Sequence, residues 1–317
     1  MKIVVLESLG LPEEEVRSIA KPITNKGHEL VVYEDKTEDI EVLKDRVKDA
    51  EILVIANMPL KGEVISAAEN LKMISVAFTG VDHVDLDVCK EEDIKVSNAA
   101  GYSTSSVTEL AYGLIISLLR NIVPLDEVTR LGQTAAGYSQ FDLSGKNLGV
   151  IGTGAIGSKV AEIGLAFGCN VFAYNRSEKD ELKKLGVKYL TLDELLKESD
   201  IVTIHLPNTK ETEGLINKEK IRLMKPTALL INTARGPIVD NNALAQALKD
   251  GKIAGAGVDV FDMEPPLPKD YPLLNAPNIV VTPHIGFATK EAMIRRAYIT
   301  FENISKWEEG KQQNIIL

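Results

Sequence analysis

The sequence contains little cysteine and no long apolar run. Its two cysteines, Cys89 and Cys169, have neither metal-ligand spacing nor partners nearby in the chain. We expect buried, reduced thiols and no metal site, which suits a reducing cytosol. The most apolar segment, residues 110–119, is about half as long as a bilayer span requires. The first residues, MKIVVLESLG, are too short an apolar run for a signal sequence and are typical of a first strand. We therefore expect a soluble, cytoplasmic protein.

An excess of positive charge is also missing. The chain carries 36 lysines and arginines against 46 aspartates and glutamates, which gives a formal net charge of −10. This balance argues against nucleic acid or an anionic membrane as the main partner. Any anionic ligand must then be held by local positive groups. At 317 residues the chain is long for a single core, so we expect two domains.

Short apolar runs alternate with helical patterns in two series. The first series predicts strands at 2–6, 29–33, 52–56, 73–78 and 94–98. The second predicts strands at 148–152, 170–174, 201–206, 228–232, 256–260 and 278–282. Such alternation is typical of α/β folds with parallel sheets covered by helices on both faces. The last helical pattern, 289–310, follows the final strand, and we expect it to return to the first domain. The expected domains are 1–99 plus 288–317, and an inserted 100–287.

A glycine-rich turn follows the first strand of the second series. Residues 148–160 read LGVIGTGAIGSKV, so Gly152-x-Gly154-x-x-Gly157 lies between an apolar strand and an amphipathic helix. This context favours a dinucleotide site over a plain turn. Gly152 permits the tight turn, Gly154 the approach of a pyrophosphate, and Gly157 close packing of helix on strand. The N–H groups of Ala155 and Ile156 would meet the phosphates.

The end of the next strand lacks the acidic residue that usually reads the adenosine ribose. The segment FAYNRSEK places Asn175 there, 18 residues after Gly157, followed by Arg176 and Ser177. An acid would bind the 2′-OH and repel a 2′-phosphate, whereas Arg176 can pair with that phosphate. One charge-assisted hydrogen bond is worth about 1.5–3 kcal/mol, or roughly 10- to 150-fold in affinity. We expect NADP to be preferred, with a dual NAD/NADP site as the alternative.

Three polar segments stand at the ends of successive strands of the second series. They supply Arg235, Glu264 and His284. Ligands of open α/β sheets bind beyond the carboxyl ends of the strands, so the three side chains could converge there. Arg235 offers a planar fork for a carboxylate. His284 would donate the proton to a developing alkoxide, and Glu264 would hydrogen-bond the imidazole, favour its charged form and fix its orientation. The chemistry fits reduction of a 2-oxo acid.

Together these motifs resemble the D-isomer-specific 2-hydroxyacid dehydrogenases, from the first strand to the last helix. The resemblance rests on GTGAIG, HLPNTKETEGLI (205–216), NTARGPIVD, VDVFDMEPP and TPHIGFAT. It implies two doubly wound parallel-sheet domains: a discontinuous, flavodoxin-like substrate domain and an inserted Rossmann cofactor domain. A homodimer and an active site of arginine, glutamate and histidine are also implied.

The resemblance assigns further residues by position. It implies that Thr79 and Gly80 present backbone N–H groups to the substrate carboxylate. On the cofactor side it implies His205, Pro207, Thr233, Ala234, Asp259 and Gly286, with Asp259 near the carboxamide. The pocket candidates are Asn57, Met58, Leu60, Phe78 and Phe287. His28, in the turn NKGHE, is expected on the surface.

The pocket candidates suit a small 2-oxo acid such as glyoxylate or hydroxypyruvate. A branched substrate such as 2-oxoisocaproate stays open, because one methylene changes selectivity by only about 1–3 kcal/mol. Glu264 argues against the formate dehydrogenases, which resemble this chain but carry glutamine there. SVAFTG offers no basic residue for a phosphate, which weakens D-3-phosphoglycerate as a substrate. A nucleotide-sensing binding protein of the same fold is the alternative from another class.

Overall fold

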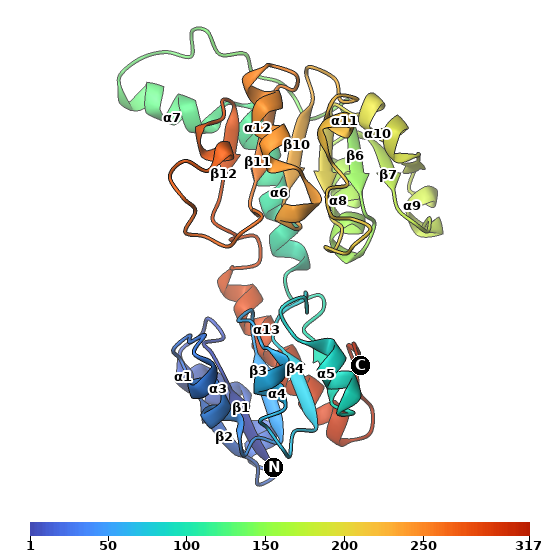
Figure 1. The fold of residues 1–317 in the computed structure, drawn as a ribbon. Coiled ribbons are helices and arrows are strands. Elements are labelled where there is room, and N and C mark those ends of the chain that lie inside the picture. Colours follow the sequence, from blue (N-terminus) through green and yellow to red (C-terminus); the bar gives the residue numbers. More distant parts are fainter. The chain divides into compact units, whose positions relative to one another are not determined.

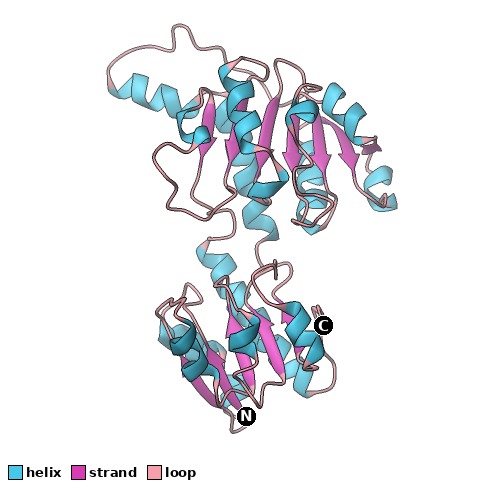
Figure 2. Cartoon of the chain, viewed as in Figure 1, coloured by secondary structure: helices cyan, strands magenta, loops and turns pink.

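The computed structural model describes residues 1–317 and divides into two compact units. Unit 1 comprises Met1–Ser103 and Ala288–Leu317, and unit 2 comprises Thr104–Phe287. Each unit contains one sheet whose strands all run parallel, with helices on both faces (Figure 2). The predicted α/β class, with two doubly wound parallel sheets, is confirmed.

Unit 1 is built on a five-stranded sheet in the order β2-β1-β3-β4-β5 (Figure 1). Its strands are β1 (Lys2–Val5), β2 (Glu29–Val32), β3 (Ile52–Ile55), β4 (Met73–Val76) and β5 (Lys95–Asn98). Its helices are α1 (Glu13–Ile19), α2 (Lys21–Thr24), α3 (Ile40–Val47), α4 (Gly62–Ile65), α5 (Leu86–Glu91) and α13 (Lys290–Glu308). This order is that of flavodoxin-like sheets. Every residue of β3 and β4 is buried, because a parallel sheet covered on both faces excludes water from both.

The C-terminal helix α13 joins unit 1 through polar contacts to the sheet. Ser75 Oγ in β4 donates to the carbonyl oxygen of Thr300 at 2.9 Å. Asn303 Nδ2 donates to the carbonyl oxygen of Asn98 at 2.8 Å. Both α13 residues are fully buried, so their polar groups need these partners. The last segment of the chain therefore completes the core that the first hundred residues begin.

His28 corrects one expectation from the sequence. Its side chain is only 13% exposed, and Nε2 lies 2.6 Å from the carboxylate of Glu308 at the end of α13. Nδ1 lies 2.9 Å from the amino group of Met1. The turn NKGHE is local in sequence, but its partner is 280 residues away, so surface exposure was the wrong expectation.

Unit 2 is built on a seven-stranded sheet in the order β12-β11-β10-β9-β6-β7-β8. Its strands are β6 (Asn147–Ile151), β7 (Asn170–Tyr174), β8 (Lys188–Tyr189), β9 (Ile201–Ile204), β10 (Leu229–Asn232), β11 (Gly255–Val258) and β12 (Ile279–Val281). Its helices are α6 (Thr104–Leu119), α7 (Ile122–Arg130), α8 (Ala155–Ala166), α9 (Asp180–Lys184), α10 (Leu192–Glu198), α11 (Lys218–Ile221), α12 (Asn241–Lys249) and the 3-10 turns η1 (Gly236–Ile238) and η2 (Pro272–Asn275). The strand order reverses between β6 and β9, where dinucleotides bind in Rossmann sheets.

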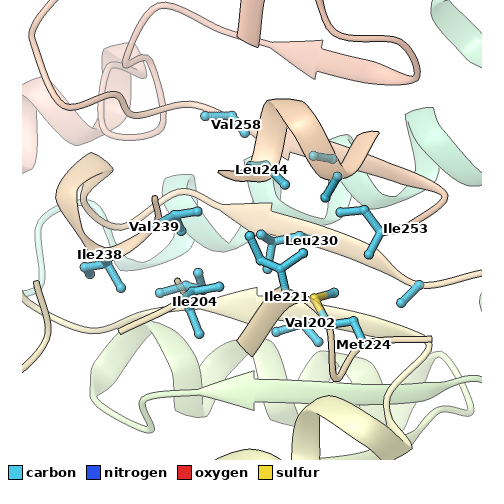
Figure 3. Close-up of a cluster of buried hydrophobic side chains, with 14 of the residues drawn as sticks. Val202, Ile204, Ile221, Met224, Leu230, Ile238, Val239, Leu244, Ile253 and Val258 are labelled. Carbon is cyan, nitrogen blue, oxygen red and sulfur yellow. The ribbon is translucent and has the colours of Figure 1, made fainter. Parts of the chain in front are cut away.

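One core cluster of unit 2 lies between the sheet and helices α11 and α12. Figure 3 shows Ile204, Leu230 and Val258, from three neighbouring strands, among the side chains of Ile221 and Leu244. All five are at most 2% exposed. Burial of each such side chain stabilises the fold by about 1.5–3 kcal/mol. The cluster fixes β9, β10 and β11, whose carboxyl ends lead to His205, Arg235 and Glu264.

The two cysteines are free and buried, as expected. Burial raises the pKa of the Cys89 thiol to about 11, and it does the same for Cys169. Both thiols therefore stay protonated near neutral pH, which makes them poor nucleophiles.

No single helix is both long enough and apolar enough to cross a lipid bilayer. The pair α6 and α7, bent by 57° at its break, meets the length and composition criteria together. Eight of the α6 side chains are buried in the protein.

Candidate active site

The glycine loop connects β6 to α8 and has two crowded positions and one open one. Gly152 adopts φ +92°, and a Cβ there would lie 2.6 Å from the carbonyl oxygen of His205. A Cβ at Gly157 would lie 1.8 Å from the carbonyl oxygen of Gly152. A Cβ at Gly154 would meet no atom within 4 Å. The first and third glycines are thus required by packing, while the second leaves the loop open on its outer side.

The start of α8 offers backbone donors at this open side. Gly154 is the N-cap residue, and no side chain caps the helix. The N–H groups of Ala155 and Ile156, in the first turn, have no carbonyl partner within the helix. Together with the partial positive charge of a helix N-terminus, they suit a pyrophosphate. The residues present fit a dinucleotide.

Asn175, at the end of β7, connects the glycine loop to the following turn. Its Oδ1 accepts from the backbone N–H of Thr153 at 3.5 Å, and its Nδ2 donates to the carbonyl oxygen of Ser177 at 2.8 Å. Arg176 is exposed and makes no hydrogen bond or ion pair within the protein. The pKa of Glu211 is lowered, mainly by the hydroxyl of Thr209 and in small part by the charge of Arg176. The guanidinium is therefore available to a ligand.

His205 follows β9 and lies against the glycine loop. Its Nε2 is 2.9 Å from Thr203 Oγ1, and its Nδ1 is buried without a partner. Burial lowers the pKa of His205 to about 3, so the ring is neutral at physiological pH. The predicted neighbour Pro207 is exposed, and its carbonyl oxygen accepts from Thr212 Oγ1 at 2.7 Å.

Arg235 lies in the loop after β10, which is held by a buried asparagine. Asn232 is 1% exposed; its Oδ1 accepts from the N–H of Ala234 at 3.1 Å and its Nδ2 donates to the carbonyl oxygen of Arg235 at 2.9 Å. Arg235 Nη1 donates to the carbonyl oxygen of Ala234 at 2.8 Å. Thr233, between them, is buried. The amide of Asn232 thus fixes the backbone on both sides of the arginine side chain.

Asp259 organises the loop that carries His284. Its carboxylate is 1% exposed and accepts from Thr282 Oγ1 at 2.5 Å and from the N–H groups of Ile285 and Gly286 at 2.8 Å each. Its carbonyl oxygen accepts from the N–H of His284 at 2.9 Å. His284 adopts φ +56°, a conformation that costs a non-glycine residue about 1–2 kcal/mol. The contacts of Asp259 hold the loop in this conformation.

His284 and Glu264 form the central pair of the site. His284 Nδ1 lies 2.9 Å from Oε2 of Glu264 and 3.0 Å from Oε1. The His284 side chain is 15% exposed and that of Glu264 is 70% exposed. The ring of Phe287 meets the imidazole edge-on, with the centroids 5.1 Å apart. With Nδ1 directed at the carboxylate, Nε2 is the nitrogen left for proton transfer.

The residues of unit 1 predicted at the substrate follow β3 and β4. Thr79 is exposed and Gly80 half-buried, and the carbonyl oxygen of Thr79 accepts from Asn98 Nδ2 at 2.7 Å. Asn57 is half-buried, while Phe78 is 7% exposed. Met58 and Leu60, also expected at the pocket, are 0% and 1% exposed and belong to the core. Their burial indicates a packing role, and their place at the pocket stays a prediction.

Two residues that fix loop backbones were not identified from the sequence. Asn232 ends an apolar strand, and its role depends on its side-chain amide, which bonds the backbone of the following loop. Glu7 is 3% exposed, and its Oε1 accepts from the N–H groups of Ala56 and Met58 at 2.9 and 2.8 Å. It thus fixes the backbone around Asn57. A charged residue directly after an apolar strand was the available signal.

Several known proteins are similar to this chain over most of its length. Residues 112–286 match the family model described as the NAD-binding domain of D-isomer-specific 2-hydroxyacid dehydrogenases. A glyoxylate reductase of Korarchaeum cryptofilum is 35% identical over 98% of this chain and 94% of its own. A hydroxypyruvate reductase of Blautia hydrogenotrophica is 35% identical over 100% of this chain and 99% of its own. The solved structure of an acyclic imino acid reductase in complex with NADPH and D-Arg is 31% identical, covers 100% of both chains and has a TM-score of 0.90.

Proposed function

Because this chain belongs to the D-isomer-specific 2-hydroxyacid dehydrogenase family, we propose that it reduces glyoxylate or hydroxypyruvate to the 2-hydroxy acid with NADPH, in the D configuration where the product is chiral. As a member of that family it is an NAD(P)-dependent dehydrogenase. The observation that carries the proposal is the contact between His284 Nδ1 and the Glu264 carboxylate, on the loops that follow neighbouring strands β12 and β11. Two relatives of high coverage are a glyoxylate reductase and a hydroxypyruvate reductase, which supports this substrate class.

In the proposed reaction, Arg235 binds the substrate carboxylate through its guanidinium and polarises the adjacent carbonyl. Glu264 stabilises the protonated imidazole through Nδ1–H and fixes the ring. His284 Nε2 then gives its proton to the carbonyl oxygen as negative charge develops there. When bound, the nicotinamide cofactor supplies the hydride that the carbonyl carbon accepts. One hydride and one proton convert the 2-oxo acid into the 2-hydroxy acid.

For the cofactor, unit 2 is the proposed binding unit, with the glycine loop and the start of α8 at the pyrophosphate. The proposed roles of His205, Pro207, Thr233, Ala234, Asp259 and Gly286 are to line the remaining length of the site. The absence of an acid at Asn175 and the unpaired charge of Arg176 support NADPH over NADH. Unit 1 is the proposed substrate unit, with Asn57, Phe78, Thr79 and Gly80 at the substrate.

The proposal also includes a homodimer. Helix α7 has no buried residue, and the segment from α7 to residue 141 exposes several large apolar side chains, namely Ile122, Val123, Leu131, Tyr138 and Phe141. Beside it lies a cavity of about 640 Å³, lined in part by Val123, Phe141 and Ala276. We call the apolar segment 122–141 the arm, and the cavity beside it the groove. The arm and the groove are suited to a two-fold contact, in which each copy supplies both surfaces.

Steady-state assays with a panel of 2-oxo acids test the proposed activity. The panel includes glyoxylate, hydroxypyruvate, 2-oxoisocaproate and 3-phosphohydroxypyruvate, each with NADPH and with NADH. We expect the highest kcat/KM for glyoxylate or hydroxypyruvate with NADPH. Oxidation of neither cofactor with any substrate, combined with tight dinucleotide binding, would instead favour a nucleotide-sensing protein.

A further inference from the structure

The turn after β7 contains a second cation, Lys179, whose position is fixed by the protein. Its side chain is half-buried, and Nζ donates to Ser158 Oγ at 2.9 Å. Ser158, in the first turn of α8, in turn donates to the carbonyl oxygen of Thr153 at 2.9 Å. An ammonium has three donors, so the contact with Ser158 leaves two of them unused by the protein. The amine of Lys179 is thus held on the glycine-loop side of the turn.

The backbone at Lys179 is tied to the same loop. The N–H of Lys179 donates to the hydroxyl oxygen of Tyr189 at 3.1 Å, and that hydroxyl donates to Thr153 Oγ1 at 3.2 Å. Thr153 lies between Gly152 and Gly154, and its N–H donates to Asn175. The glycine loop, Asn175 and Lys179 therefore form one hydrogen-bonded unit.

The acidic residues of this turn do not neutralise Lys179. Glu178 forms an ion pair with Lys183, and Asp180 lies 3.8 Å from the same amine. Lys179 forms no ion pair, and neither does Arg176. In a chain with ten more acidic than basic residues, these two cations without an ion pair lie three residues apart on one turn. A positioned ammonium with two unused donors beside a second cation can bind an anionic ligand through charge-assisted hydrogen bonds.

From these contacts we infer that Lys179 is a specificity-determining residue that binds the 2′-phosphate of NADPH together with Arg176. The inference rests on the proposed function, because it assigns a residue to the proposed cofactor. Arg176 provides an exposed and adaptable fork, whereas Lys179 provides a point charge fixed in advance by Ser158. A positioned donor loses less conformational entropy on binding than a free one. A purely structural role for Lys179, as a link between the turn and α8, would not distinguish the two dinucleotides.

Binding titrations distinguish these roles without turnover. The dissociation constants of NADPH, NADH and 2′,5′-ADP are measured by fluorescence or calorimetry for the wild type and for Lys179→Met, Lys179→Arg, Arg176→Ala and Lys183→Met. Lys183→Met is the matched control, because this nearby lysine is already paired with Glu178 and Asp180. Melting curves recorded in parallel verify that each variant is folded.

We expect Lys179→Met to weaken NADPH and 2′,5′-ADP by about tenfold while NADH changes by less than about twofold. Lys179→Arg should retain most of the NADPH affinity, and Lys183→Met should leave all three constants near those of the wild type. If Lys179→Met weakens NADPH and NADH equally, while Arg176→Ala weakens NADPH alone, the inference is wrong and the proposed cofactor stands. If the wild type binds NADH more tightly than NADPH, both the inference on Lys179 and the proposed cofactor are wrong.

Discussion

The imidazole of His284 and the carboxylate of Glu264 meet through Nδ1, at 2.9 Å from Oε2 and 3.0 Å from Oε1. The histidine side chain is largely enclosed while the glutamate side chain is mostly in water. The Glu264 carboxylate can therefore accept a hydrogen bond from Nδ1–H while it stays in contact with solvent. In the proposed mechanism, this contact orients the ring and leaves Nε2 to face the substrate.

We expect His284→Gln to lower kcat by about 10²- to 10⁴-fold, because it removes the proton donor. The dissociation constant for NADPH should stay near the wild-type value. Glu264→Gln should lower kcat less, because glutamine keeps a hydrogen-bond partner for Nδ1 but removes the negative charge beside the imidazole. Steady-state rates at saturating substrate and NADPH give both results. An unchanged kcat in Glu264→Gln would contradict the role given to this carboxylate.

Asp259→Asn tests the support of the His284 loop. The carboxylate accepts three hydrogen bonds, and an amide of the same shape turns one acceptor oxygen into a donor facing a donor. Leaving a buried N–H without an acceptor costs about 1–3 kcal/mol. We expect the free energy of unfolding to fall by that amount, with a drop in kcat. Chemical denaturation provides the measurement, and an unchanged free energy would contradict the prediction.

The glycine loop offers a pair of matched substitutions. Gly157→Ala forces a Cβ against the carbonyl oxygen of Gly152 and should cost about 3 kcal/mol or more. Gly154→Ala enters open space, so its cost should stay below about 1 kcal/mol, the size of an N-cap effect. Nevertheless, Gly154→Ala should weaken dinucleotide binding, because its methyl group occupies the side open to the pyrophosphate. Equal losses of stability in the two variants would contradict this assignment.

His205 makes the fold sensitive to acid. Its pKa is about 3 in the folded protein against 6.5 for an unperturbed histidine. The unfolded chain therefore takes up a proton below pH 6.5 that the folded protein takes up only near pH 3, so stability is lost as the pH falls through this window. At pH 5 the loss from this residue is at most about 2 kcal/mol relative to pH 7. His205→Asn should lose correspondingly less stability between pH 7 and pH 5. Denaturation curves at both pH values measure this, and parallel losses in variant and wild type would contradict it.

Phe141→Asp tests the proposed dimer. Phe141 is 55% exposed beside the groove, and a charge there should prevent burial against a second copy. Sedimentation velocity should show a dimer for the wild type and a shift to monomer for the variant. Leu185→Asp is the control, since Leu185 is equally exposed at the end of α9, outside the arm. A monomeric wild type, or a variant that remains dimeric, would overturn this role of the arm.

Much of the fold could be predicted because a parallel sheet buried on both faces leaves a simple pattern. The runs around Ile52–Ile55 and Ile201–Ile204 are apolar throughout and are bounded by helical patterns. The two-residue strand β8 was missed, because Lys188 and Tyr189 are too short a run to show periodicity. His28 was misjudged because its partner Glu308 is distant in sequence.

In the site, His284 and Glu264 could be paired from the sequence because both follow strands of one parallel sheet. The contacts that position these two side chains could not be predicted from the sequence. The three hydrogen bonds accepted by Asp259 and the two made by Asn232 depend on loop backbones, whose conformation no periodic pattern encodes.

The place of α13 in unit 1 also has a consequence for synthesis on the ribosome. Chains emerge from the N-terminus, and domains generally fold as units during translation. Here Ser75 and Asn98 receive their partners Thr300 and Asn303 only after the whole of unit 2 has been made. Unit 2 is continuous and can fold as soon as residue 287 has emerged, whereas unit 1, although begun first, must be finished last. Until then, the apolar face of β4 that α13 covers must be kept from other nascent chains.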